Sequence, residues 1–376
     1  MAAVASPWAI VYVDETVLVN RFLSRRVAMG KLTIADIAAR AGVSKATVSR
    51  VLNDRAEGVG AETRARIRAI LDATGFQPSA MARGLKTGES RSVGLIVPDV
   101  TNPFDPLLVS GAEQRLNDAG YSLFLCNTGS DAVKQGDYIR VLIDKRVDGV
   151  ILDSVGFEAE AQVRMLEREG IPVVLLDCVI GKRAQRHGVF LDNGHGVQEA
   201  MAFLFRRPDR RLVFISGPPD VSQSVDRREA VEALKREWGL EDDRLTILDG
   251  DFTLDRGCEL VAELMLNCRH WPLPFNAVFA ANDMMALGAL KALRQADVSV
   301  PSEVEVMGYD DIPFARLLDP PLSTVAQPAR EMGAASAELL LRLIAGEKPR
   351  RKTVVMKPQL LLRGTTLDPE IVNAKS

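Results

Sequence analysis

Residues 32–53 have the sequence LTIADIAARAGVSKATVSRVLN, which predicts two short helices joined by a tight turn. Thr33 and Asp36 have the spacing of a capping box, in which two side chains satisfy free N–H groups at a helix start. Gly42 can adopt the left-handed backbone that ends the first helix. Ser44 is a good N-cap for the second helix. The spacing of these residues therefore predicts a helix-turn-helix.

The second of these helices presents two different faces. Val48, Val51 and Leu52 share an apolar side, which we expect to pack against the first helix. The other sides carry Lys, Arg, Ser and Thr, as a recognition helix does. We predict that base edges are contacted by Lys45, Ala46 and Arg50. We predict that a second set of residues binds DNA phosphates or fixes the orientation of the helix on DNA: Thr33, Ser44, Thr47, Ser49 and Asn53. A plain helical hairpin is the alternative.

Two further helical segments follow. Residues 62–74 predict a third helix that ends at Gly75. Residues 78–86, PSAMARGLK, are long enough for two helical turns, with Pro78 suited to the first turn. A helix this short is marginal on its own in water, so we expect it to fold only when DNA or a partner subunit holds it. An inert tether is the alternative.

Charge is unevenly distributed along the 376 residues, whose formal net charge is −3. Residues 29–90 hold 10 Lys and Arg against 6 Asp and Glu, whereas residues 91–376 hold 34 against 42. A basic block on an acidic body suggests that only the first block meets a polyanion.

The opening residues 1–28 do not match the patterned sequence that follows. Asp14 and Glu15 interrupt an apolar run whose start carries no basic residue, so the segment does not fit a signal peptide. Patterned sequence begins directly after Met29. We expect Met29 to be the biological start and residues 1–28 to be a non-native extension, with a genuine N-terminal arm as the alternative.

From Ser92 onward, short apolar segments alternate with helical patterns. The expected strands are 93–97, 123–126, 150–152, 173–176, 213–216, 277–280 and 304–307. The expected helices include 107–119, 158–169, 227–238, 283–296 and 330–345. This alternation predicts an α/β body of parallel sheets covered by helices, in which ligands bind beyond the carboxyl ends of the strands. The residues expected there include Asn102, Phe104, Asp153, Asn282 and Asp310. For any Asn or Asp the alternative is a helix cap or turn, and we favour it for Asp283 and Asp311.

Composition and motifs argue against several classes of protein. Hydrophobic residues make up 47% and charged residues 26%, which is ordinary for a globular protein. No apolar run reaches the roughly 18 residues of a membrane-spanning helix. The four cysteines form no CxxC, and the three histidines include no metal-ligand spacing, so we expect neither a disulfide scaffold nor a metal site. Nucleotide-binding and GxSxG motifs are missing, so we expect no enzyme and no cofactor.

Several motifs together resemble one family. Residues 32–53 and residues 75–99, GFQPSAMARGLKTGESRSVGLIVPD, closely resemble the headpiece and hinge of the lac repressor (LacI) family of bacterial regulators. The body motifs that resemble this family are NPF at 102–104, RVDGVIL at 146–152, ANDMMALGAL at 281–290, MGYDDIPFA at 307–315 and PPLSTVAQP at 320–328. The resemblance extends from Met29 to about Thr366.

The resemblance implies a particular domain organisation. It places a helix-turn-helix domain at 29–77, a hinge at 78–90 and an effector-binding and dimerisation domain at 91–366. The last resembles periplasmic sugar-binding proteins, with an N-lobe of about 91–190 plus 325–348 and a C-lobe of about 191–324 plus 349–366. It also implies that paired hinge helices enter the minor groove through Ala82, Arg83 and Leu85.

The resemblance also implies a set of effector contacts in the cleft between the lobes. The residues carried over are Ser224, Arg228, Phe252, Asn282, Asp310 and Gln327. Three departures from the family pattern bear on the identity of the ligand. Asp105 follows Asn-Pro-Phe where another aromatic is common, Val231 stands where the family has glycine, and residues 206–209 replace a usual Gly-His.

These features predict a homodimeric, ligand-responsive regulator that binds a palindromic operator, most often as a repressor, in the cytoplasm at the nucleoid. Its partners would be double-stranded DNA and a sugar, sugar acid or related metabolite. Control of a nucleoside, purine or other small-metabolite pathway is the first alternative, and an α/β enzyme with an added DNA-binding domain is the second. No heptad repeat follows Leu362, so we expect a dimer rather than a tetramer.

Overall fold

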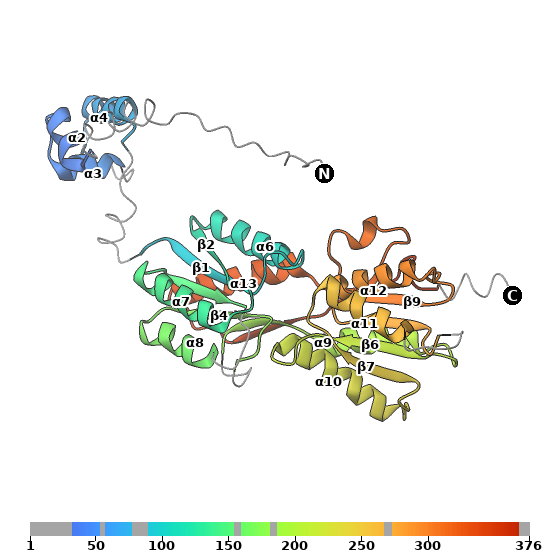
Figure 1. The fold of residues 1–376 in the computed structure, drawn as a ribbon. Helices are drawn as coiled ribbons and strands as arrows, with labels where there is room; N and C mark the ends of the chain where they lie inside the picture. The colour runs from blue at the N-terminus through green and yellow to red at the C-terminus, as the bar shows by residue number, and fades with distance from the viewer. Residues whose placement is uncertain are drawn as a thin grey trace, which may run out of the picture. The chain divides into compact units, whose positions relative to one another are not determined.

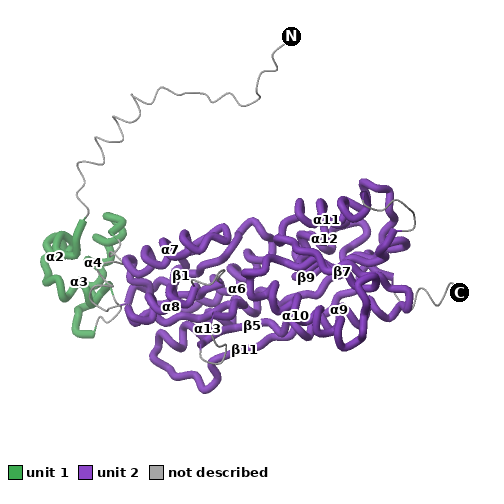
Figure 2. Tube along the Cα trace, turned by 60° about the horizontal axis from the view of Figure 1, so that its bottom comes forward, with its two compact units in different colours: residues 1–88 green, residues 89–376 purple. Residues whose placement is uncertain are grey.

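A computed structural model describes residues 32–52, 57–76, 89–153, 159–180, 186–266 and 273–367. The chain divides into two compact units, residues 1–88 and 89–376 (Figure 2). The predicted N-terminal extension, Asn53 and the hinge contacts Ala82, Arg83 and Leu85 lie outside the described residues. Among the helices that are described, none is long and apolar enough to cross a membrane.

The first unit packs three helices around a small apolar core. They are α2 (Ile34–Ala41), α3 (Lys45–Leu52) and α4 (Ala61–Thr74). Gly42 has φ 66°, and the N–H of Val43 donates to the Ala38 carbonyl at 3.0 Å, so the chain turns sharply between α2 and α3. The core consists of Ile37, Ala38, Ala41, Val48, Val51, Val59 and Ile67. The predicted helix-turn-helix is confirmed.

The second unit has two lobes, each built on a six-stranded sheet between helices (Figure 1). The first sheet has the order β11-β5-β4-β3-β1-β2, and the second has the order β12-β10-β9-β8-β6-β7. Every pairing is parallel except that of β10 with β12. The predicted α/β body of covered parallel sheets is therefore confirmed.

The first lobe uses segments from both ends of the body. Its strands are β1 (Ser92–Val97), β2 (Ser122–Asn127), β3 (Gly149–Leu152), β4 (Val173–Leu176), β5 (Gly188–Leu191) and β11 (Thr353–Met356). Its helices are α6 (Asp105–Asp118), α7 (Ala132–Asp144), α8 (Ala159–Arg168) and α13 (Ala329–Ile344). Val93, Leu95 and Val97 of β1 pack with the core of α6 and α13, whereas Ile96 points to the opposite side, with α7 and α8.

The second lobe repeats this layered arrangement. Its strands are β6 (Leu212–Ser216), β7 (Leu245–Asp249), β8 (Ala277–Ala280), β9 (Glu305–Asp310), β10 (Ser323–Ala326) and β12 (Gln359–Leu361). Its helices are α9 (Asn193–Leu204), α10 (Ser222–Glu237), α11 (Leu254–Leu266), α12 (Asp283–Gln295) and a 3-10 turn at Ala315–Leu317. Helices α9 and α10 pack together, as do α11 and α12.

The chain passes between the lobes three times, and two of the predicted crossing points are wrong. Residues 325–348 were expected in the first lobe, but β10 continues to Ala326 beside β9 of the second sheet. Residues 349–366 were expected in the second lobe, but β11 pairs with β5 of the first, with Thr353 opposite Gly188. The crossings therefore fall after Ala326 and after Met356, because backbone pairing holds both strands in place.

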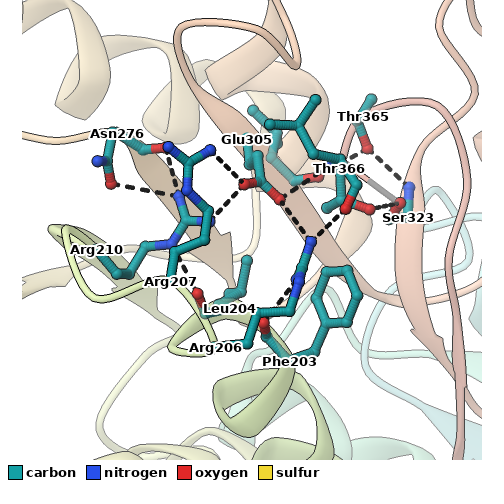
Figure 3. Close-up of polar contacts among 12 residues, drawn as sticks. Phe203, Leu204, Arg206, Arg207, Arg210, Asn276, Glu305, Ser323, Thr365 and Thr366 are labelled. Carbon is teal, nitrogen blue, oxygen red and sulfur yellow. Dashed lines mark hydrogen bonds and ion pairs between the residues drawn. The ribbon is translucent and has the colours of Figure 1, made fainter. Parts of the chain in front are cut away.

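A buried charge cluster closes the end of the second lobe where strands β6 and β9 begin (Figure 3). The side chain of Arg210 is fully buried. Its guanidinium donates to the carbonyls of Leu204 at 2.8 Å and Asn276 at 2.9 Å, and to the carboxylate of Glu305. All three partners are oxygen acceptors, so the burial of this cation is compensated.

Glu305 is also almost fully buried and collects further partners. It accepts from the backbone N–H of Leu367 at 3.1 Å, and the guanidinium groups of Arg206 and Arg207 lie 3.9 and 3.6 Å away. The Arg206-Arg207 departure from the family pattern is therefore part of this cluster. It does not bear on ligand identity as expected, because it lies at the start of the strands and ligands bind at their carboxyl ends.

Candidate functional site

The face of α3 that points away from the headpiece core carries the predicted base-contacting residues. Lys45, Ala46 and Arg50 are exposed, while Val48 and Val51 are buried. Lys45 and Ser49, like Ala46 and Arg50, are separated by four residues, so the four side chains form one continuous surface. This surface has the composition and shape that a recognition helix presents to a major groove.

The polar residues at the two helix starts have structural partners within the headpiece. Thr33 and Asp36 form the expected capping box, because the Asp36 N–H donates to Thr33 Oγ1 at 3.3 Å and the Thr33 N–H donates to Asp36 at 2.7 Å. The Thr33 hydrogen bonds lower the pKa of Asp36. Ser44 accepts from the Thr47 N–H at 3.2 Å. Thr33 and Ser44 remain exposed, while Thr47 and Ser49 are half-buried.

A cavity of about 240 Å³ lies between the two lobes of the second unit. The first lobe lines it from segments that follow β1, β2, β3 and β4, and the second lobe lines it from segments at the ends of β6, β7, β8, β9 and β10. Every contributing strand therefore ends at the cavity, which is where α/β folds place ligands. The lobes also touch beside it, since Gln223 Nε2 donates to Asp153 at 3.4 Å.

A buried arginine organises the floor of the cavity. Arg227 of α10 is only 3% exposed and donates to Asn193 Oδ1 at 2.9 Å and to the Ala281 carbonyl at 2.6 Å. Its guanidinium stacks on the Tyr309 ring at 3.8 Å and lies 3.7 Å from the Asp310 carboxylate. These contacts fix the only lining cation among the described residues.

Two of the predicted effector contacts, Phe252 and Asn282, lie in the loops that follow β7 and β8. Asn282 caps α12 by accepting from the Met285 N–H at 2.9 Å, and its amide donates to the Phe252 carbonyl at 2.9 Å. The Phe252 ring lies on the backbone of Gly217, where an added Cβ would come within 2.2 Å of the ring. The ring therefore forms an apolar platform in the cavity wall.

Seven of the nine predicted effector residues line this cavity: Asn102, Phe104, Asp153, Phe252, Asn282, Asp310 and Gln327. Ser224 is buried and does not belong to the lining. The placement of Arg228 is wrong. Its guanidinium bonds Glu232 at 2.9 Å and the carboxylate of Asp249, and these hydrogen bonds raise its pKa. Arg227, the preceding residue, occupies the cavity instead.

The lining is acidic, and the sequence reasoning missed part of it. Asp105 and Asp177 also face the cavity, together with the more peripheral Asp99, Asp220 and Asp251. Burial raises the pKa of Asp105 to about 7, with added repulsion from Asp310 and Asp99. Burial likewise raises the pKa of Asp310 to about 7, although Arg227 opposes the shift. Burial and the charges of Asp105 and Asp177 raise the pKa of Asp153 well above its usual range.

The chain is similar to known regulators along nearly its whole length. Residues 33–79 match the model of bacterial regulatory proteins of the lacI family, and residues 202–366 match a periplasmic binding protein-like domain. The HTH-type transcriptional repressor PurR of Photobacterium profundum is 32% identical over 349 residues, which cover 89% of this chain and 99% of that protein. The ribose operon repressor of Escherichia coli is 33% identical over 337 residues, which cover 89% of this chain and 99% of that protein.

Solved structures show the same architecture. A lac repressor dimer bound to operator and an anti-inducer has a TM-score of 0.80 at 23% identity, covering 90% of this chain and all of that one. The complex of the transcriptional regulator CelR with cellobiose has a TM-score of 0.66 at 30% identity. The match covers 89% of this chain and 99% of that one.

The fold and the two candidate sites define a DNA-binding regulator with a small-molecule cavity between two lobes. With relatives above 30% identity over 89% of its length, the chain belongs to the lacI family of bacterial regulatory proteins. It is a ligand-responsive transcriptional repressor and not an enzyme, as its relatives are repressors. The predicted family, fold class and general function are confirmed.

Proposed function

We propose that α3 reads operator DNA through the exposed surface formed by Lys45, Ala46 and Arg50. The buried Val48 and Val51 on the opposite side of the helix support this orientation. Arg50 would pair with a guanine edge, and Ala46 would leave room for a thymine methyl group. Thr33, Ser44, Thr47 and Ser49, with Asn53, would contact phosphates and fix the orientation of the helix.

Arg50→Ala is expected to weaken operator binding by about 1–3 kcal/mol per half-site and to relax the preference at one base position. Titration of operators that vary one base pair at a time measures both effects. Arg66→Ala, which removes an exposed arginine from α4, is the matched control and should leave base preferences intact. An Arg50→Ala protein with an unchanged preference at every position would rule out the assignment.

We propose that the cavity between the lobes binds the effector, and the convergence of nine strand ends on it is the observation that carries this proposal. Its carboxylates and side-chain amides are acceptors for hydroxyl groups, and Phe104 and Phe252 offer apolar faces. A hydroxyl-rich metabolite such as a carbohydrate or a nucleoside fits this lining. Its excess of Asp argues against a sugar acid, because like charges repel inside a low-dielectric cavity.

Variants of the neighbouring residues Arg227 and Arg228 test whether the effector binds in the cavity, because only Arg227 lines it. Arg227→Lys keeps the charge but loses the planar fork, so we expect about tenfold or more effector to be needed for a half-maximal change in operator binding. Arg228→Lys is the matched control and should respond as wild type, because its partners Glu232 and Asp249 lie outside the cavity. Both variants should bind operator normally without effector. If Arg228→Lys were the impaired variant, the assignment would be reversed.

We propose that the chain acts as a homodimer on a two-fold operator. Large apolar side chains are exposed on both lobes: Phe124 at 44% and Leu125 at 47% on β2, and Phe314 at 52% and Leu317 at 76% after β9. Exposed groups of this kind mark protein interfaces, and a second copy would cover them. Light scattering should give the mass of two chains at micromolar concentration, whereas a monomer or a stable tetramer would contradict the proposal.

The remaining functional assignments are proposals that rest on family membership. The hinge residues Ala82, Arg83 and Leu85 would enter the minor groove, and effector binding would change the angle between lobes and thus operator affinity. Reciprocal coupling requires that operator also change effector affinity. The repressor would act in the cytoplasm at the nucleoid, on genes that handle its effector.

A further inference from the structure

The inner part of the cavity gathers four carboxylates around one guanidinium. Asp105, Asp153, Asp177 and Asp310 are each at most 5% exposed and line the cavity. Arg227 lies 3.7 Å from Asp310, but it also donates to Asn193 and Ala281. Within the described part of the chain, no ion pair reaches Asp105 or Asp153. The site therefore holds more buried carboxyl groups than its own cation can pair with.

Hydrogen bonds within the described residues satisfy only part of the acceptor capacity of Asp105 and Asp153. Asp105 accepts from the backbone N–H of Asp99 at 3.1 Å, and Asp153 accepts from Gln223 at 3.4 Å. A carboxylate can accept about four hydrogen bonds, so Asp105 and Asp153 keep capacity for a ligand. The repulsion among these groups is consistent with the raised pKa values of Asp105, Asp153 and Asp310.

A neighbouring amide gives independent support for a ligand that donates hydrogen bonds. Gln327 is 8% exposed, lines the cavity and donates through Nε2 to Asp310 at 2.6 Å. Its Oε1 is buried and accepts no hydrogen bond from the described residues. A buried acceptor without a donor is costly, so this oxygen marks a position where a ligand N–H or O–H belongs.

The carboxylates are not arranged for a metal ion. No group of three or more His, Cys, Asp or Glu among the described residues has the geometry to hold one. A positive charge on a larger organic molecule can instead reach several carboxylates through separate N–H bonds. The apolar Phe104 and Phe252 in the same lining would contact the carbon skeleton of such a molecule.

We infer that the effector carries a protonated amine, as in an amino sugar or another amine-bearing polyol, and that its ammonium group is held by Asp105 and Asp153. This inference rests on the proposed effector cavity and narrows its ligand class. Asp105 stands where an aromatic residue is common after Asn-Pro-Phe in the family pattern, and here it adds a carboxyl group to the lining. Asp310 and Gln327 would take hydroxyl donors of the same molecule.

Matched pairs of small probes test the inference on the full chain. Tris(hydroxymethyl)aminomethane and pentaerythritol have nearly the same shape, but only the first carries an ammonium group, and glucosamine with glucose makes a second pair. We expect the amine of at least one pair to raise Tm in a HEPES buffer, with the neutral partner binding about tenfold or more weakly. Asp153→Asn should abolish the difference, whereas Asp118→Asn, on the exposed end of α6, should keep it.

The pH dependence gives a second readout. The charged groups that face Asp105 are Asp99, Asp153, Asp310 and, beyond Asp310, Arg227. An ammonium ligand binds the ionised carboxylates, so its affinity should rise from about pH 6 to about pH 7, where the amine is still protonated, and binding in this range should release protons, which calorimetry in two buffers measures. A neutral polyol that uses protonated Asp105 as a donor would show the opposite trend.

Two outcomes would overturn the inference. In the first, a neutral probe raises Tm as much as its amine partner does. In the second, neither amine raises Tm. Neither outcome would contradict the proposal that the effector binds in this cavity. That proposal fails separately if Arg227→Lys and Arg228→Lys respond alike to a metabolite that changes operator binding.

Discussion

Replacing Glu305 with glutamine is expected to lower the free energy of unfolding of the second unit by about 3–5 kcal/mol. Among the described residues, Glu305 is the carboxylate that forms an ion pair with Arg210, whose side chain has no exposed surface, and the change removes its charge. Glutamine keeps the size of the side chain and one acceptor oxygen, so packing is preserved and the loss is electrostatic. The buried guanidinium would then stay charged at a large desolvation cost.

A surface pair provides the comparison for this variant. Arg115 and Glu338 lie 2.6 Å apart, with side chains 36% and 50% exposed. Glu338→Gln should therefore lower stability by under about 1 kcal/mol, because water screens both charges. Urea unfolding of the two variants measures the difference. Equal losses would mean that the buried cluster contributes no more than an exposed ion pair.

The headpiece was predictable because its signals are local. Thr33, Asp36, Gly42 and Ser44 act within four residues of their own positions, through capping bonds and one left-handed turn. The apolar residues Val48 and Val51 needed only helical periodicity to be assigned to the core. Short-range chemistry of this kind is visible in sequence before any tertiary structure is known.

Five of the described strands were not expected from the sequence: β5, β7, β10, β11 and β12. β10 reads Ser-Thr-Val-Ala, yet Ser323 and Thr324 are fully buried. Thr324 donates to Asp283 and the Ser323 N–H donates to Thr365 at 2.8 Å, so partners about 40 residues away satisfy them. The edge strand β11 reads Thr-Val-Val-Met, and both of its valines are exposed. Such strands depend on partners that sequence periodicity does not show.

Arg228 was assigned to the cavity by the family resemblance alone, and the phase of its helix was not used to check it. The helix was expected to begin at residue 227, whereas α10 begins at Ser222. Its buried residues Ser224, Arg227, Val231 and Leu234 recur at intervals of three or four, so the inward phase points to Arg227 and away from Arg228. The signal was present in the sequence and required the correct helix start.

Asp105→Asn is expected to stabilise the protein increasingly as the pH rises. The folded-state pKa of Asp105 is raised to about 7 from an unfolded value of 3.8, mainly by burial. The folded state therefore holds a proton that the unfolded state has lost between these values, and stability falls by about 1.4 kcal/mol per pH unit across that window. Over the whole window the loss amounts to about 4 kcal/mol.

Asparagine at position 105 has no proton to lose and can still accept from the Asp99 N–H through its side-chain oxygen. The variant should therefore be close to wild type near pH 4 and exceed it by up to about 4 kcal/mol near pH 8. Unfolding by urea at several pH values measures this divergence. Asp118→Asn should run parallel to wild type within about 0.5 kcal/mol, because its carboxylate is exposed. A gap between Asp105→Asn and wild type that stays constant with pH would mean that Asp105 ionises equally in both states and that burial does not raise its pKa.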